Sequence, residues 1–66
     1  MPLININMAT GRTPEQKRAL MDAVSQATVD AIGASRDSIR VWITEFPPED
    51  YMAGHETLAE KRARES

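Results

Sequence analysis

A chain of 66 residues that has no cysteine and a single histidine has few ways to hold a fold together. A domain of this length buries only about 60% of the surface that its unfolded chain exposes. Small domains therefore add disulfides, a structural metal or partner subunits. The composition excludes disulfides and thiolate metal sites and argues against a structural zinc site. We therefore expect one domain, residues 1–66, that is stabilised as a homo-oligomer.

The charge and hydropathy patterns exclude several classes of partner. The formal net charge is −2, and acidic and basic residues are interspersed without the basic stripe that nucleic-acid binding needs. No apolar run approaches the length of a membrane span, and the first residues lack the basic and apolar regions of a signal peptide. The sequence predicts a cytoplasmic protein without a nucleic-acid or membrane partner.

Two segments alternate between apolar and polar residues, as strands with one buried face do. In residues 2–9 (PLININMA), the apolar positions of one face are Ile4, Ile6 and Met8. In residues 39–46 (IRVWITEF), apolar positions alternate with Arg40, Trp42 and Thr44. Two prolines at 47 and 48 end the second strand.

A long helix is predicted between these strands, over residues 14–32. Thr13 and Gln16 fit a capping box around Pro14, and Gly33 is a natural stop. The apolar positions that recur at helical spacing are Leu20, Val24, Ala27 and Ala31. A strand, a helix and a strand in this order form a βαβ unit with parallel strands and a right-handed crossover.

The rest of the chain predicts a small C-terminal extension. Residues 51–56 (YMAGHE) read as a loop or short hairpin, and residues 56–66 as a charged helical tail. The fold class is therefore α+β: two parallel strands, one long helix and a short C-terminal hairpin or tail. A two-stranded sheet is marginal alone and leaves both edges open, which again favours a homo-oligomer.

Three residues form a candidate site for a small carboxylate substrate. If Met1 is removed, Pro2 carries a free secondary amine, one of the few groups that titrate near neutral pH. Partial burial and nearby cations lower the pKa of such an amine, as general base catalysis requires. Arg12 follows the first strand and Arg40 lies in the second, and guanidinium groups bind carboxylates in a fork geometry.

Each of these residues also has a purely structural interpretation. Pro2 is tolerated at the start of a strand, and Arg12 fits an ordinary exposed turn. Arg40 could form a salt bridge between subunits with Asp37 or Glu45, and Tyr51 could pack in an interface. Taken one at a time, these interpretations are the simpler ones.

Taken together, the residues resemble the 4-oxalocrotonate tautomerase family of the tautomerase superfamily. The resemblance rests on the opening Met1-Pro2, on GRTPEQKRAL from Gly11, on SIRVWITEF, and on the loop from Tyr51 to Gly54, and it spans residues 2–62. It implies a βαβ protomer with a short C-terminal hairpin. It also implies dimers that share a four-stranded sheet and a hexamer built as a trimer of dimers.

The resemblance further implies a cofactor-independent isomerase that uses no metal. Pro2, freed of Met1, is the implied general base, which moves a proton from the 2-hydroxyl group of a dienol to a distant carbon. Arg12 is implied to bind the distal carboxylate, and Arg40, from a neighbouring subunit, the 2-oxo acid end. Tyr51 stands where the family commonly has phenylalanine, and Ala9 where a larger aliphatic residue is common. We expect both to line the pocket of a 2-hydroxymuconate-type substrate, in aromatic catabolism or a biosynthetic pathway.

Two alternatives from other classes stay open. Related enzymes add water to haloacrylates or acetylenic acids with a carboxylate that activates water, but residues 52–54 (MAG) contain no carboxylate. A hydratase or dehalogenase is therefore expected only as a side activity. The other alternative is a non-catalytic oligomeric module, since a fold by itself does not imply a function.

Overall fold

The computed structural model describes residues 1–66 and confirms the predicted α+β chain of elements. In order, these elements are β1 (Leu3–Ala9), α1 (Pro14–Ile32), the 3-10 turn η1 (Arg36–Ser38), β2 (Arg40–Phe46), the 3-10 turn η2 (Pro48–Asp50), β3 (Met52–Ala53), β4 (Glu56–Thr57) and α2 (Leu58–Glu65). The segment that sequence alone left as a loop or hairpin is the antiparallel hairpin β3–β4.

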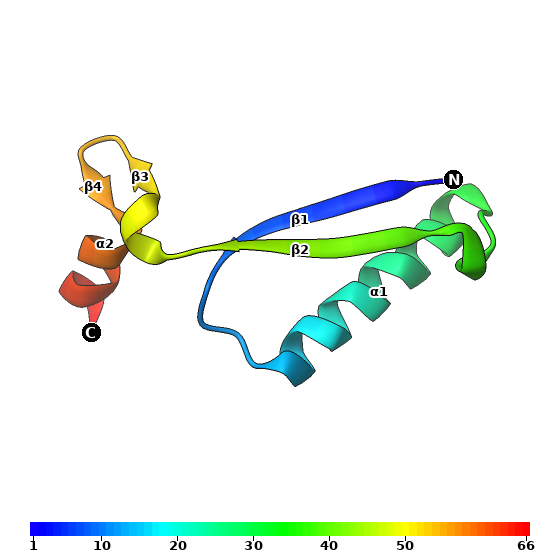
Figure 1. Cartoon of the computed structure of the whole chain (residues 1–66), viewed down its shortest axis with the longest axis horizontal. Coiled ribbons are helices and arrows are strands. Elements are labelled where there is room, and N and C mark those ends of the chain that lie inside the picture. The colour runs from blue at the N-terminus through cyan, green and yellow to red at the C-terminus, as the bar shows by residue number, and fades with distance from the viewer.

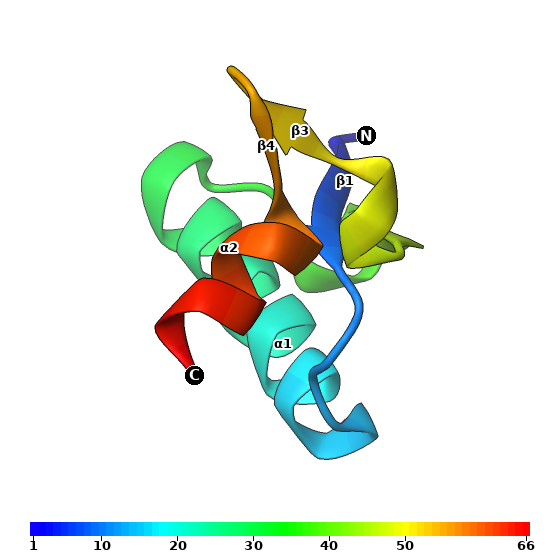
Figure 2. The same cartoon turned by 90° about the vertical axis from the view of Figure 1, so that its left-hand side faces the viewer.

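The two long strands form a parallel sheet with α1 across one face (Figures 1 and 2). The register runs from Leu3 opposite Arg40 to Ala9 opposite Phe46. Apolar side chains such as Ile6 are partly buried on the face that α1 covers, whereas polar side chains on the other face are exposed. The predicted alternation is confirmed, and one face of the sheet stays open in the protomer.

The ends of α1 are set by its own sequence, as predicted. The Thr13 hydroxyl accepts a hydrogen bond from the backbone N–H of Gln16 at 3.1 Å, and the Gln16 side chain accepts one from the Thr13 N–H at 3.0 Å. Gly33 ends the helix with a left-handed φ of 73°, and its N–H donates to the Val29 carbonyl. Both bonds of the capping box satisfy N–H groups that have no partner inside the helix.

The inward face of α1 differs from the predicted one in its second half. Leu20 and Val24 are partly buried, as expected, but Ala27 and Ala31 are exposed. Val29 is partly buried in their place. Helical spacing alone did not separate neighbouring apolar positions, and turning valine inward removes more apolar surface from water than turning alanine inward.

The protomer has very little core of its own. Ile39, just before β2, is the only buried residue, at 9% exposure. The accessible surface is 4900 Å² for 7.3 kDa, whereas a compact monomer of this mass exposes about 4200 Å². The radius of gyration is 15.1 Å, against about 11 Å for a compact chain of this length. The protomer is therefore elongated and leaves apolar surface open.

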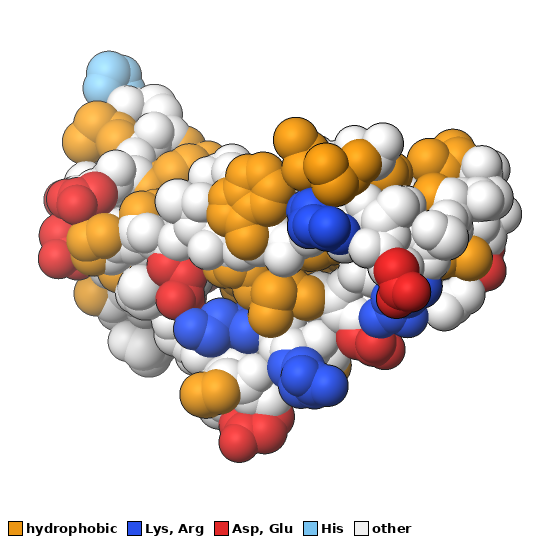
Figure 3. All heavy atoms as spheres, turned by 45° about the vertical axis from the view of Figure 1, so that its right-hand side comes forward, with side chains coloured by type: hydrophobic (Ala, Val, Ile, Leu, Met, Phe, Trp, Pro, Cys, Tyr) orange, Lys and Arg blue, Asp and Glu red, His pale blue; other side chains and the backbone are white.

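Large apolar side chains are exposed on the strands and on the hairpin. Leu3 and Trp42 lie on the open sheet face at 64% and 46% exposure, and Met52 lies in the hairpin at 60%. Figure 3 shows hydrophobic side chains gathered along the upper rim of the molecule. Exposed apolar patches of this kind mark surfaces that bind another molecule.

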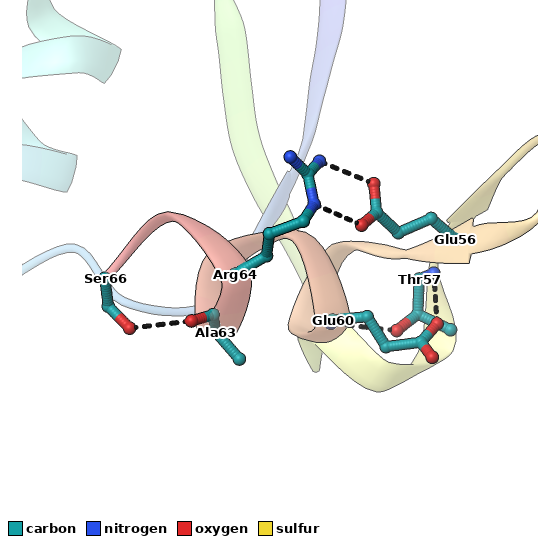
Figure 4. Close-up of polar contacts among 6 residues, drawn as sticks. All are labelled: Glu56, Thr57, Glu60, Ala63, Arg64 and Ser66. Atoms are coloured by element: carbon teal, nitrogen blue, oxygen red, sulfur yellow. Dashed lines mark hydrogen bonds and ion pairs between the residues drawn. The ribbon is translucent and has the colours of Figure 1, made fainter.

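The C-terminal extension lies beyond the far end of the sheet, away from most of α1 (Figure 1). A second capping box joins Thr57 and Glu60 at the start of α2 (Figure 4). The hydrogen bond that the Thr57 backbone N–H donates to the Glu60 carboxylate is the main reason why the pKa of Glu60 lies below its usual value. Neither α1 nor α2 has the length and apolar character that crossing a membrane requires.

Candidate active site

The predicted site residues lie in two groups at opposite ends of the β1–β2 sheet. Pro2 and Arg40 lie at one end, where the Arg40 N–H donates to the Pro2 carbonyl at 3.0 Å. Ala9 ends β1 at the other end, and Arg12 and Tyr51 follow the two strands there. Seven residues of β1 span about 20 Å from first to last Cα. One chain therefore does not gather all five residues around a small molecule.

Pro2 is held in a defined position by the sheet. The residue is partly buried, and the hydrogen bond from Arg40 to its carbonyl fixes it beside the start of β2. Since proline has no backbone N–H, this strand start leaves no donor unpaired. With Met1 attached, the Pro2 nitrogen is an amide without basicity. A basic nitrogen at this point of the sheet requires that the chain begin at Pro2.

The Arg40 guanidinium turns back along its own chain. Its Nη1 donates to the carbonyl oxygen of Asp37 at 2.7 Å and to that of Ile39 at 3.4 Å. Within the chain, Arg40 forms no ion pair with Asp37 or Glu45, the partners considered from sequence. These contacts use one terminal nitrogen and orient the group, and the other nitrogens remain available for a ligand.

A cavity of about 680 Å³ lies at the opposite end of the sheet and contains Ala9 and Tyr51. The Tyr51 ring stacks on Phe46 with centroids 5.5 Å apart and an interplanar angle of 18°. Leu58 and Lys61 of α2 also line this cavity. The structure thus brings Ala9 and Tyr51 together in a pocket with an aromatic wall and a cation.

Sequence reasoning missed several residues of this cavity. Phe46 could have been found, because it is the register partner of Ala9 at the end of the sheet. Asn7 also follows from the alternation of β1, since it shares a face with Ala9. Lys61 and Leu58 carry no such signal, because only the path of the hairpin brings α2 back beside the sheet.

Arg12 lies apart from that cavity in the protomer. Its side chain lines a smaller pocket of about 230 Å³ with Met8, Gln16, Lys17 and Leu20. Arg12 forms no hydrogen bond within the chain. The preceding Gly11 has a φ of 129°, which disfavours a side chain there. The adjoining Thr10 carbonyl accepts a hydrogen bond from Arg62 of α2 at 3.2 Å, so the turn that carries Arg12 is tied down.

The larger cavity contains one carboxylate, and that carboxylate is paired. The two oxygens of Glu56 accept hydrogen bonds from Arg64 at 2.8 and 2.9 Å (Figure 4). This pairing raises the pKa of Arg64. The chain contains no group of three or more histidine, cysteine or acidic side chains placed to hold a metal ion. The pocket offers cations and an aromatic wall, which suit an unsaturated carboxylate.

Known proteins are similar to this chain in sequence and in fold. The family model described as tautomerase enzyme matches residues 2–61. A 2-hydroxymuconate tautomerase of Pseudomonas putida is 49% identical over 51 residues, which cover 77% of this chain and 81% of that protein. TomN, a 4-oxalocrotonate tautomerase homologue in the tomaymycin biosynthetic pathway, is 35% identical with a TM-score of 0.91, over 98% of this chain and 100% of that one. A heterohexamer 4-oxalocrotonate tautomerase from Chloroflexus aurantiacus is 37% identical with a TM-score of 0.86, over 91% and 97%.

Proposed function

Because the chain belongs to the 4-oxalocrotonate tautomerase family and is an isomerase, we propose that it converts a 2-hydroxydienoate such as 2-hydroxymuconate into its keto isomer. The O–H bond at C2 breaks, a C–H bond forms at C3 or C5, and the C2–O bond becomes a carbonyl. Substrate and product are isomers, so no co-reactant is needed. Because the family is one of enzymes, the alternative of a non-catalytic module is rejected.

Pro2 is the proposed base in this reaction, after removal of Met1. Its amine takes the proton from the 2-hydroxyl group and returns it to carbon as a 1,3- or 1,5-transfer. Partial burial at the start of β1 supports this role, because burial favours the neutral amine. A base whose pKa lies near the working pH transfers protons most efficiently.

Arg40 and Arg12 are the proposed binding groups for the two ends of the substrate. Arg40 holds the 2-oxo acid end and stabilises the negative charge that develops on the 2-oxygen. Arg12 holds the distal carboxylate and draws electron density toward it. Ala9 and Tyr51 form the proposed wall, and the stacked Phe46 ring makes that wall rigid.

The site is proposed to form between copies of the chain. The edge of β1 that faces away from β2 is unpaired in the protomer. If two copies pair there around a twofold axis, the start of one β1 lies beside the end of the other. That pairing brings Pro2 of one copy to Ala9, Arg12 and Tyr51 of a second copy. Such dimers, associating through the exposed hairpins into a hexamer, would also cover the apolar surface of the protomer.

The observation that carries the proposed function is Pro2 at the start of a β1 strand in a chain of this family. The test pairs intact mass with an ultraviolet assay of 2-hydroxymuconate ketonisation on the same sample. We expect a mass without Met1 and rapid loss of the dienol absorbance. Retained Met1 in a fully active sample would exclude Pro2 as the base, and a processed but inactive sample would exclude this substrate class.

The shared site makes a separate prediction for mixed oligomers. Pro2→Ala and Arg12→Ala chains are each expected to be nearly inactive. After denaturation and refolding of an equal mixture, about a quarter of the sites combine Pro2 of one copy with Arg12 of another. We therefore expect the mixture to recover about a quarter of the wild-type rate. Each variant refolded alone is the control, and no recovery in the mixture would mean that both residues of a site come from one chain.

A further inference from the structure

We propose that Lys17 is a positioning residue: its ion pair with Glu45 keeps Arg12 free to bind the distal carboxylate of the substrate. This inference rests on the proposed function, in which Arg12 is the anion-binding group.

The Arg12 guanidinium has no hydrogen-bond or ion-pair partner within the chain. Four of the other arginines donate side-chain hydrogen bonds, to Asp22 and Gln26, to main-chain carbonyls, or to Glu56. Arg18 also has no partner, and it lines a different pocket together with Asp22. Arg12 lines the pocket that also contains Lys17. A free guanidinium in a pocket is available for a ligand only while nearby carboxylates are engaged elsewhere.

Glu45 is a candidate for such a competing carboxylate. Its Oε1 lies 2.9 Å from the Lys17 Nζ, and the two side chains are only 28% and 27% exposed. Glu45 is the register partner of Met8, and Met8, Lys17 and Arg12 line the same 230 Å³ pocket. The Glu45 carboxylate therefore binds a side chain, Lys17, that lines the same pocket as Arg12.

The charges at this pocket explain why the ion pair matters. With Lys17 present, Glu45 is neutralised and Arg12 carries the uncompensated positive charge. Without Lys17, Glu45 is left without its partner, and a guanidinium fork is the geometry that a carboxylate prefers. Because Glu45 belongs to the same chain, its effective concentration at Arg12 is far above that of a dissolved substrate. The distal carboxylate would then have to displace it.

The simpler alternative is that the ion pair only stabilises the packing of the start of α1 against β2. A purely structural role would change the KM of every substrate equally, and removing Glu45 as well would not restore it. The proposed role would change the KM only of substrates with a distal carboxylate, and removing the competing Glu45 carboxylate would restore that KM. The two roles are therefore separable by substrate and by double substitution.

The experiment uses processed full-length chain and measures KM and kcat for two substrates. One is 2-hydroxymuconate, and the other is 2-hydroxypenta-2,4-dienoate, which lacks the distal carboxylate. We expect Lys17→Met to raise the KM for the first about three- to tenfold, the range of a partly exposed charged pair. Its kcat should change little, and the KM for the monocarboxylate should stay unchanged. The double variant Lys17→Met/Glu45→Gln should return the KM for 2-hydroxymuconate to the wild-type value.

Two further variants complete the test. Arg18→Met, which removes an unpaired arginine of α1 from a different pocket, is the matched control and should leave both KM values unchanged. Glu45→Gln alone keeps the Lys17 ammonium and should not raise either KM, so the proposal stays testable if Lys17→Met folds poorly. Equal increases for both substrates, or no rescue in the double variant, would overturn the inference. A wild-type protein that turns over neither substrate would instead overturn the proposed function.

Discussion

Replacing Pro2 with alanine is expected to lower kcat/KM for 2-hydroxymuconate about 10²- to 10⁴-fold, the contribution of a positioned general base. Alanine at the new N-terminus still presents an amine, but a primary one on a backbone that is free to rotate. Proline presents a secondary amine on a rigid ring. The backbone N–H of Arg40 donates a hydrogen bond to the Pro2 carbonyl and holds the residue in place. The measurement is the rate of dienol loss by ultraviolet absorbance, on protein whose N-terminus has been checked by intact mass.

The control for this variant is its assembly. Pro2 donates no hydrogen bond to the sheet, so alanine should leave the sheet and the oligomer intact. Circular dichroism and size-exclusion chromatography of the Pro2→Ala protein should therefore match those of the wild type. A correctly assembled Pro2→Ala protein with the wild-type rate would exclude the proline amine as the base.

Replacing Arg40 with alanine is expected to lower kcat about 10²-fold, which is the effect of removing one group that stabilises a developing oxyanion. The Arg40 Nη1 already donates to the Asp37 and Ile39 carbonyls, so the group is oriented before substrate binds. Its contribution should appear mainly in kcat, because the charge on the 2-oxygen is largest in the transition state. Steady-state kinetics of ketonisation separate kcat from KM.

Lysine at the same position is the informative comparison. Arg40→Lys keeps the positive charge but loses the fork geometry, so its rate should lie between those of Arg40→Ala and the wild type. Arg36→Ala is the matched control, since Arg36 lies in the neighbouring turn and binds Asp22 on α1. If Arg36→Ala lowers kcat as much as Arg40→Ala, the effect belongs to the turn and not to the substrate site.

The elements of the fold could be predicted because their signals are local. The capping box at Thr13 and the stop at Gly33 bound α1, and both depend on residues a few positions apart. Alternation in β1 and β2 identified which side chains face the helix, since the side-chain period of a strand is two. The same reasoning could not separate Ala27 from Val29 on α1, because both lie at acceptable helical spacing.

The residues of the candidate site could be predicted, but not which of them lie together. Pro2, Arg12 and Arg40 stand out by residue type and by position beside predicted strands. That Arg12 lines one pocket while Ala9 and Tyr51 line another follows from the tertiary path of the turn after β1. The partner of Glu45 was also beyond reach, because Lys17 is 28 residues from Glu45.

The sequence by itself determined the βαβ order and the bounds of α1 and predicted partner copies, because helix caps, strand alternation and chain length act locally or through composition. Only the tertiary structure decided that Arg12 lines one pocket while Ala9 and Tyr51 line another. It also decided that Lys17 engages Glu45 and leaves the Arg12 guanidinium free. These are relations between distant parts of the chain, and only the packing of α1 against the sheet and the path of each turn determine them.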